Sequence, residues 1–103
     1  MREADIYRAA LEKWGADAQT LMVFEEMAEL QKELCKNARG KDNRGSIAEE
    51  IADVQIMLEQ MIALHNCRAM VRTYKAAKLD RLKERLGLGE VETWTISRFG
   101  NFQ

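Results

Sequence analysis

The 103-residue chain contains no proline, two cysteines and one histidine. Proline interrupts helices and shapes tight turns, so its absence favours long helices over many short strands. The cysteines, Cys35 and Cys67, match no metal-binding spacing such as C-x-x-C, and we expect both to be free thiols packed as small apolar side chains. Without histidine and cysteine ligand sets, a zinc site is disfavoured.

The chain also lacks an excess of either charge and any long apolar run. Sixteen Lys and Arg against 17 Asp and Glu give a net charge of −1. This balance excludes the strongly basic chain of a general nucleic-acid binder and an acidic disordered tail. No apolar run approaches the roughly 18–20 residues that span a bilayer, and the N-terminus lacks the apolar core of a secretion signal. We therefore expect a cytoplasmic protein with no membrane partner.

Hydrophobic residues make up 47% of the chain, and glycines divide it into helical segments over 3–14, 18–38 and 46–86. A single helix over the last segment would be about 60 Å long, so we expect it to break near residues 65–68. The sequence therefore predicts an all-α fold with four helices.

The boundaries of the later helices can also be predicted. Ser46 followed by Glu49 fits a capping box, which predicts that the third helix begins there. The fourth helix is expected from Arg68 to Leu86, stopping at Gly87. We assign residues 1–89 to one domain and 90–103 to a C-terminal extension, whose β-branched residues and Trp94 suit a short strand or extended arm.

Two helices carry matching pairs of carboxylates beside an apolar stripe. In the second helix, Glu26 and Glu29 flank the arc of Val23, Met27, Leu30 and Leu34, which we expect to be buried. In the third helix, Glu50 and Asp53 flank the arc of Ile47, Ile51, Val54, Leu58 and Met61 in the same way.

If the two helices pack antiparallel through these stripes, the four carboxylates converge, with Glu25 and Glu49 at the rim. Clustered carboxylates repel one another and have raised pKa values unless a cation is present. Several carboxylate oxygens are the ligand set that Mg²⁺ selects, with Mn²⁺ as a possible substitute. The alternative is an ordinary solvated acidic face with ion pairs along each helix.

The expected fourth helix is basic. Lys75 and Lys78 fall on or beside its apolar arc, and Arg81 and Arg85 lie close to them. These side chains either extend along the surface into water or bind the phosphates of a substrate. Trp14 is a weaker candidate for stacking on a nucleobase, because tryptophan is more often part of a core or an interface.

Together, Glu25-Glu26-Met27-Ala28-Glu29 and Glu49-Glu50-Ile51-Ala52-Asp53 resemble the E-E-x-x-E … E-x-x-D signature of the MazG-like nucleotide pyrophosphohydrolases, in the all-α NTP pyrophosphatase superfamily. The resemblance covers roughly residues 5 to 86 and includes the basic last helix. It implies a four-helix MazG-like bundle completed by oligomerisation, as a homodimer or homotetramer, and Mg²⁺-dependent hydrolysis of a nucleoside triphosphate to the monophosphate and pyrophosphate.

The resemblance also implies roles for particular residues. Glu26, Glu29, Glu50 and Asp53 would be metal ligands, and Glu25 or Glu49 would orient or deprotonate the attacking water. Two alternatives stay open: a relative specific for dUTP or phosphoribosyl-ATP, and a non-catalytic helical interaction module. The charge distribution favours a nucleotide substrate, since residues 25–53 hold 8 acids and 5 bases while residues 68–86 hold 7 bases and 2 acids.

Overall fold

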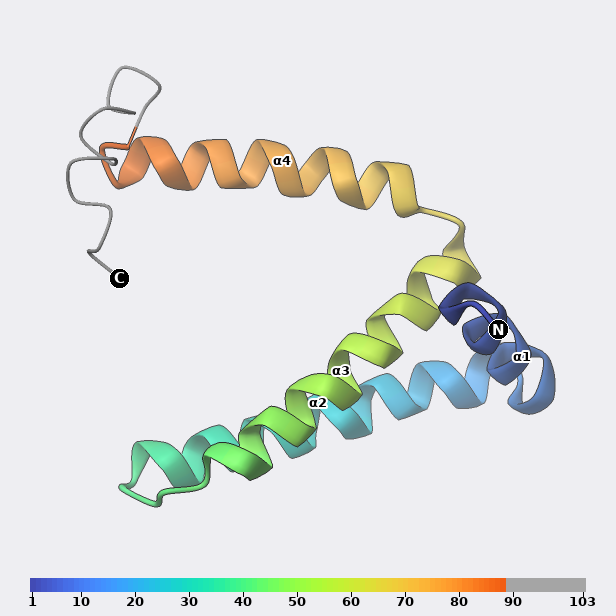
Figure 1. Ribbon diagram of the computed structural model, residues 1–103, viewed down its shortest axis with the longest axis horizontal. Helices are drawn as coiled ribbons and strands as arrows, with labels where there is room; N and C mark the ends of the chain where they lie inside the picture. Colours follow the sequence, from blue (N-terminus) through green and yellow to red (C-terminus); the bar gives the residue numbers. More distant parts are fainter. Residues whose placement is uncertain (89–103) are drawn as a thin grey trace. The chain divides into compact units, whose positions relative to one another are not determined.

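The computed structural model describes residues 1–88, which form four α-helices and no strand (Figure 1). The helices are α1 (Glu3–Trp14), α2 (Ala16–Ala38), α3 (Arg44–His65) and α4 (Arg68–Arg85). The prediction of an all-α fold with four helices is confirmed for this part of the chain. The strand or arm predicted over residues 90–103 lies outside the described residues.

The chain divides into two compact units at the end of α3. The first unit, Met1–Cys67, contains α1, α2 and α3, and the second begins at Arg68 and contains α4. In the first unit α2 and α3 pack side by side and α1 packs against both (Figure 1). Thr20 lies beside Met61 near one end of the pair, and Glu33 beside Asn43 near the other, so the two helices run antiparallel.

Three helices end with the same hydrogen-bonding pattern. After α2, α3 and α4 respectively, Gly40, Asn66 and Gly87 adopt positive φ, and the next residue donates its backbone N–H to a carbonyl five residues earlier. This arrangement satisfies carbonyl groups that the end of a helix leaves free. The predicted stop of the last helix at Gly87 and the break between residues 65 and 68 are both confirmed.

The predicted start of α3 is wrong. The helix begins at Arg44, two residues before Ser46, and Asn43 precedes it without a side-chain hydrogen bond to the helix N-terminus. The Asn43 side chain instead donates two hydrogen bonds to Glu33 of α2. A contact between helices therefore sets where α3 begins, and the capping box at Ser46 does not.

The interior of the first unit is small. Val23, Val54 and Met57 are its buried apolar side chains, and Gln19, Asn43 and Gln60 are buried polar ones. Part of each predicted apolar arc is not buried: Met27 is 50% exposed and Leu34 48%, and Ile51 and Leu58 are also exposed. The reason is that α2 and α3 meet through the flank that carries the acids, which turns the rest of each arc outward.

The cysteine prediction is correct in one respect and wrong in another. Both thiols are free, but Cys35 is exposed rather than packed, and Cys67 is half-buried. Cys35 follows Glu26 by nine residues, which places it about half a turn around α2 from the face that meets α3. Across residues 1–88, no helix is both long enough and apolar enough to cross a membrane.

Candidate metal centre

Three of the four predicted metal ligands lie together between α2 and α3. Glu26 of α2 and Glu50 and Asp53 of α3 each contribute a carboxylate oxygen, and these oxygens lie within 4.8 Å of one another. All three residues are half-buried. Antiparallel packing brings them together from separate helices, as the matching acid pairs predicted.

The electrostatics of this cluster are unfavourable for three negative charges. Partial burial raises the pKa of Glu26, and the negative charges of Asp53 and Glu50 and a hydrogen bond with Asp53 raise it further. Burial also raises the pKa of Glu50, followed by the negative charges of Asp53 and Glu29. Glu26 and Glu50 are therefore harder to ionise than an isolated carboxylate, unless a cation compensates the charge.

One oxygen of the cluster has no partner at all. Glu50 Oε2 is shielded from solvent and accepts no hydrogen bond from any described residue. A buried carboxylate oxygen without a hydrogen bond is costly, so this atom needs a proton or a cation. The ligand atoms that Glu26, Glu50 and Asp53 offer to a metal are all carboxylate oxygens, the hard ligands that Mg²⁺ and Mn²⁺ prefer. The residues present therefore fit such an ion.

The other predicted acids surround this cluster. Glu29 is exposed and lies 3.9 Å from Lys32, and its charge helps to raise the pKa values of both Glu26 and Glu50. Glu25 and Glu49 are exposed, and the charge of Glu49 contributes to the raised pKa of Glu50. The roles of these three residues stay predictions.

Sequence reasoning missed a polar contact next to the cluster. Asn43 Nδ2 donates to the backbone oxygen and to Oε1 of Glu33, each at 2.9 Å, and Lys36 Nζ lies 3.2 Å from Glu33 Oε2. These contacts hold the pKa of Glu33 below its usual value, the hydrogen bond from Asn43 being the largest cause. Glu33 follows Glu26 by seven residues and Asn43 precedes Glu50 by seven, but this spacing does not indicate which residues of two neighbouring helices meet.

The predicted phosphate-binding cations lie on α4, in the second unit. Lys75, Lys78, Arg81 and Arg85 are all exposed. Lys75 and Lys78 border a shallow apolar groove on this helix, formed by Val71, Tyr74, Leu79 and Leu82. Phosphate binding by these four residues stays a prediction.

Trp14, the predicted base-stacking residue, is the last residue of α1. Its side chain is exposed, and Lys13 Nζ lies 5.4 Å from the centroid of its ring. This distance is within the range of a cation–π interaction. A role in nucleobase stacking stays a prediction.

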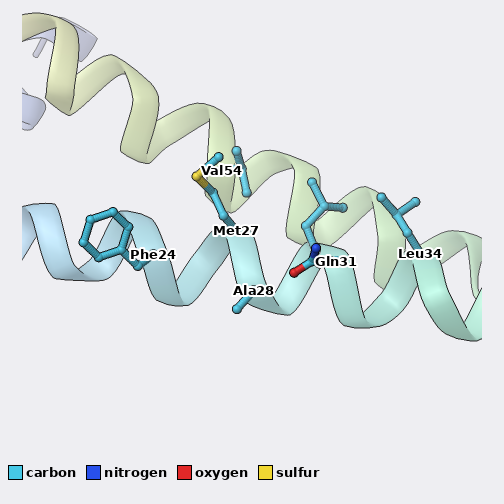
Figure 2. Close-up of a pocket in the computed structure, with 7 residues that line it drawn as sticks. Phe24, Met27, Ala28, Gln31, Leu34 and Val54 are labelled. Carbon is cyan, nitrogen blue, oxygen red and sulfur yellow. The ribbon is translucent and has the colours of Figure 1, made fainter.

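A second groove runs along α2. Its lining is almost entirely apolar and comes from Phe24, Met27, Ala28, Leu30, Gln31 and Leu34 of α2, with Val54 from α3 (Figure 2). Met27 and Val54 are the sequence neighbours of Glu26 and Asp53. The groove therefore includes residues next in sequence to two members of the acidic cluster.

Comparison of the chain with known protein families, with curated proteins and with solved structures gave no match.

Proposed function

We propose that this protein is a Mg²⁺-dependent nucleoside triphosphate pyrophosphohydrolase of the MazG-like type. The observation that carries the proposal is the convergence of Glu26, Glu50 and Asp53 from two helices, with a buried Glu50 oxygen that lacks a partner. The raised pKa values of Glu26 and Glu50 support a cation at this point. The resemblance of the two acidic motifs to the MazG-like signature supplies the reaction.

In this proposal Glu26, Glu29, Glu50 and Asp53 hold the metal, as Mg²⁺ or, in substitution, Mn²⁺. When bound, the ion supplies charge neutralisation at the substrate phosphates and lowers the pKa of a coordinated water. Two of these carboxylates lie on one flank of α2 and two on one flank of α3. In this proposal all four face the substrate from the same side.

The carboxylate of Glu25 or Glu49 accepts a proton from the attacking water. The water oxygen forms a bond to the α-phosphorus, the bond from that phosphorus to the α–β bridging oxygen breaks, and pyrophosphate leaves. Lys75, Lys78, Arg81 and Arg85 neutralise the charge that develops on the pyrophosphate, and Trp14 stacks on the base.

The proposal includes assembly into a homodimer or homotetramer. Phe24, Met27, Leu34, Ile51 and Leu58 expose large apolar side chains on α2 and α3. Phe24, Met27 and Leu34 line one groove, and an exposed apolar patch marks an interaction site in many proteins. A second copy of the chain would cover it and enlarge a core that is small for one chain.

The decisive experiment measures pyrophosphate release from a panel of canonical and modified nucleoside triphosphates with Mg²⁺. Glu50→Gln and Asp53→Asn each remove one charge from the cluster and are expected to lower kcat/KM by at least about 100-fold, on the scale of lost metal ligands and transition-state contacts. Glu12→Gln makes the same chemical change at an exposed position of α1 and is expected to change kcat/KM by less than about twofold. Undiminished activity in both cluster variants would refute the site.

The exposed apolar groove on α2 favours one alternative, a non-catalytic helical interaction module. That function predicts no turnover of any nucleotide and no Mg²⁺ binding by calorimetry. Selective turnover of dUTP or phosphoribosyl-ATP within the same panel would instead identify a specialised relative.

A further inference from the structure

We propose that Asn43 is a positioning residue, which holds Glu26, Glu50 and Asp53 in their metal-binding arrangement through its contact with Glu33. We name the contact of Asn43, Glu33 and Lys36 the α2–α3 clasp. The inference rests on the proposed metal site and adds to it a residue that touches neither the metal nor the substrate.

The clasp is built from well-formed contacts. Asn43 is only 6% exposed, and its Nδ2 donates to both the backbone oxygen and Oε1 of Glu33 at 2.9 Å. Its Oδ1 accepts a hydrogen bond from Asn37 Nδ2 at 3.3 Å. Lys36 Nζ lies 3.2 Å from the other carboxylate oxygen of Glu33. Asn43 therefore has both its donor group and its acceptor engaged with α2.

Asn43 has no competing role in starting its own helix. It occupies the position before α3, where an asparagine side chain usually accepts a hydrogen bond from the helix N-terminus. No such bond is formed, because the side chain is directed to α2. The contact between helices is what this residue provides.

The spacing of the clasp from the acids explains how it positions them. Seven residues complete almost two helical turns, so positions seven apart lie on nearly the same face, about 10.5 Å along the axis. Glu33 and Glu26 have this relation on α2, and Asn43 directly precedes α3, seven residues before Glu50. Fixing Glu33 against Asn43 therefore fixes both the rotation and the register of the faces that carry the acids.

The clasp also opposes a force that the acids create. Glu26, Glu50 and Asp53 repel one another across the helix pair in the absence of a cation. The charge of Glu33 adds a smaller repulsion toward Glu50, while Lys36 pairs with Glu33 and Asn43 is neutral. It keeps the two helices together at the point nearest the turn while the acids push them apart.

The test measures Mn²⁺ binding to the full chain by electron paramagnetic resonance. The buffer contains no urea, and the conditions are chosen so that every variant is folded. Asn43→Asp places a carboxylate against that of Glu33 and is expected to weaken Mn²⁺ binding by at least about tenfold, as loss of supporting contacts around metal ligands does. Adding Glu33→Gln to Asn43→Asp restores the side-chain hydrogen bond with donor and acceptor exchanged and restores the total charge, while the backbone oxygen of residue 33 stays without its donor from residue 43. The double variant is expected to bind within about threefold of the original chain.

A matched control separates positioning from general stability. Leu11→Ala removes a half-buried side chain from α1 and lowers the stability of the same unit, without touching α2–α3 contacts near the turn. We expect its Mn²⁺ affinity to change by less than about twofold, since the folded state keeps its acids in place. Unchanged Mn²⁺ affinity in Asn43→Asp, or equal losses in Asn43→Asp and Leu11→Ala, would overturn the inference.

Failure of the proposed metal site gives a different result. If the original chain binds no Mn²⁺, the proposed function fails, and amide hydrogen exchange without metal then decides the role of the clasp. Asn43→Asp is expected to speed exchange over residues 44–53 by at least about tenfold relative to residues 3–14, and Leu11→Ala to do the reverse. Equal acceleration of both segments by Asn43→Asp would refute the clasp on its own.

Discussion

At the scale of single residues, the structure places Glu26 and Glu50 where burial and neighbouring negative charges disfavour their ionised forms. The pKa values of Glu26 and Glu50 are raised above their ordinary value of 4.5, whereas that of Glu33 is lowered by Asn43 and Lys36. Glu33 is ionised at neutral pH and stabilises the fold through its contacts. Glu26 and Glu50 destabilise the metal-free fold when they ionise.

These shifts predict a particular dependence of stability on pH. Between the unfolded pKa of 4.5 and the raised folded values, the folded chain binds more protons than the unfolded chain, so stability falls as pH rises. The stabilising contribution of Glu33 is already complete above pH 4.5 and does not offset this fall. In EDTA, we therefore expect the urea midpoint to decrease with increasing pH above 4.5.

Two controls check the origin of that decrease. Asp53→Asn removes a charge that raises both pKa values, so its urea midpoint should fall less steeply with pH. Excess Mg²⁺ should raise the midpoint at neutral pH, because a ligand that binds only the folded state stabilises it. A midpoint that is flat in EDTA, or that does not respond to Mg²⁺, would contradict the electrostatic description of the cluster.

The residues of the acidic cluster were predictable from the sequence, and those of the clasp were not. Glu26, Glu50 and Asp53 follow from helical periodicity, because each lies on the flank of an apolar stripe. Asn43 contacts Glu33 only because the turn brings the two helices into one register, and periodicity carries no information on register. The same register moved the start of α3 to Arg44, where the capping-box pattern had favoured Ser46.

At the scale of elements, the glycines that join the helices differ in what they require. Gly15 links α1 to α2 with φ of 89° and ψ of 158°, a conformation that other residues rarely adopt. Gly45 lies in the first turn of α3 without a positive φ, and a Cβ built at either position meets no atom within 4 Å. The two glycines therefore differ in backbone strain and not in available space.

This difference predicts opposite effects of one substitution. Gly15→Ala should lower the free energy of unfolding by about 1–3 kcal/mol, the cost of a strained backbone at a non-glycine residue. Gly45→Ala should raise it by about 0.5–1 kcal/mol, because alanine restricts the unfolded chain and favours the helix. Urea titration of both variants at fixed pH measures the two signs. A stabilising Gly15→Ala would show that the joint between α1 and α2 is not strained.

The helix faces were only partly predictable. The stripes of α2 and α3 were identified, and Val23 and Val54 are buried as expected. Met27 and Leu34 are exposed, because the two helices meet through their acidic flanks. Helical periodicity identifies an apolar stripe but does not tell which part of it packs against another helix of the same chain.

At the scale of the whole molecule, the exposed apolar side chains predict assembly. Leu34 is 48% exposed in the groove on α2, and Leu34→Glu should weaken self-association at least tenfold, or about 1.4 kcal/mol, because a buried unpaired charge is costly. Ala52→Lys serves as the control, because it introduces a charge at an exposed position of α3 that does not line the groove. Light scattering across a dilution series gives both dissociation constants. A fully active monomer would contradict the proposed assembly.

The proximity of the acidic cluster to a short turn has a consequence for folding kinetics. All the proposed metal ligands lie between residues 26 and 53, on helices that adjoin in the chain (Figure 1). Closing so short a loop costs little chain entropy, and contacts that are close in sequence form quickly. The helical hairpin of α2 and α3 can therefore gather its carboxylates before the rest of the chain is in place. A divalent cation added during refolding should then shorten the folding time itself, rather than only slow unfolding.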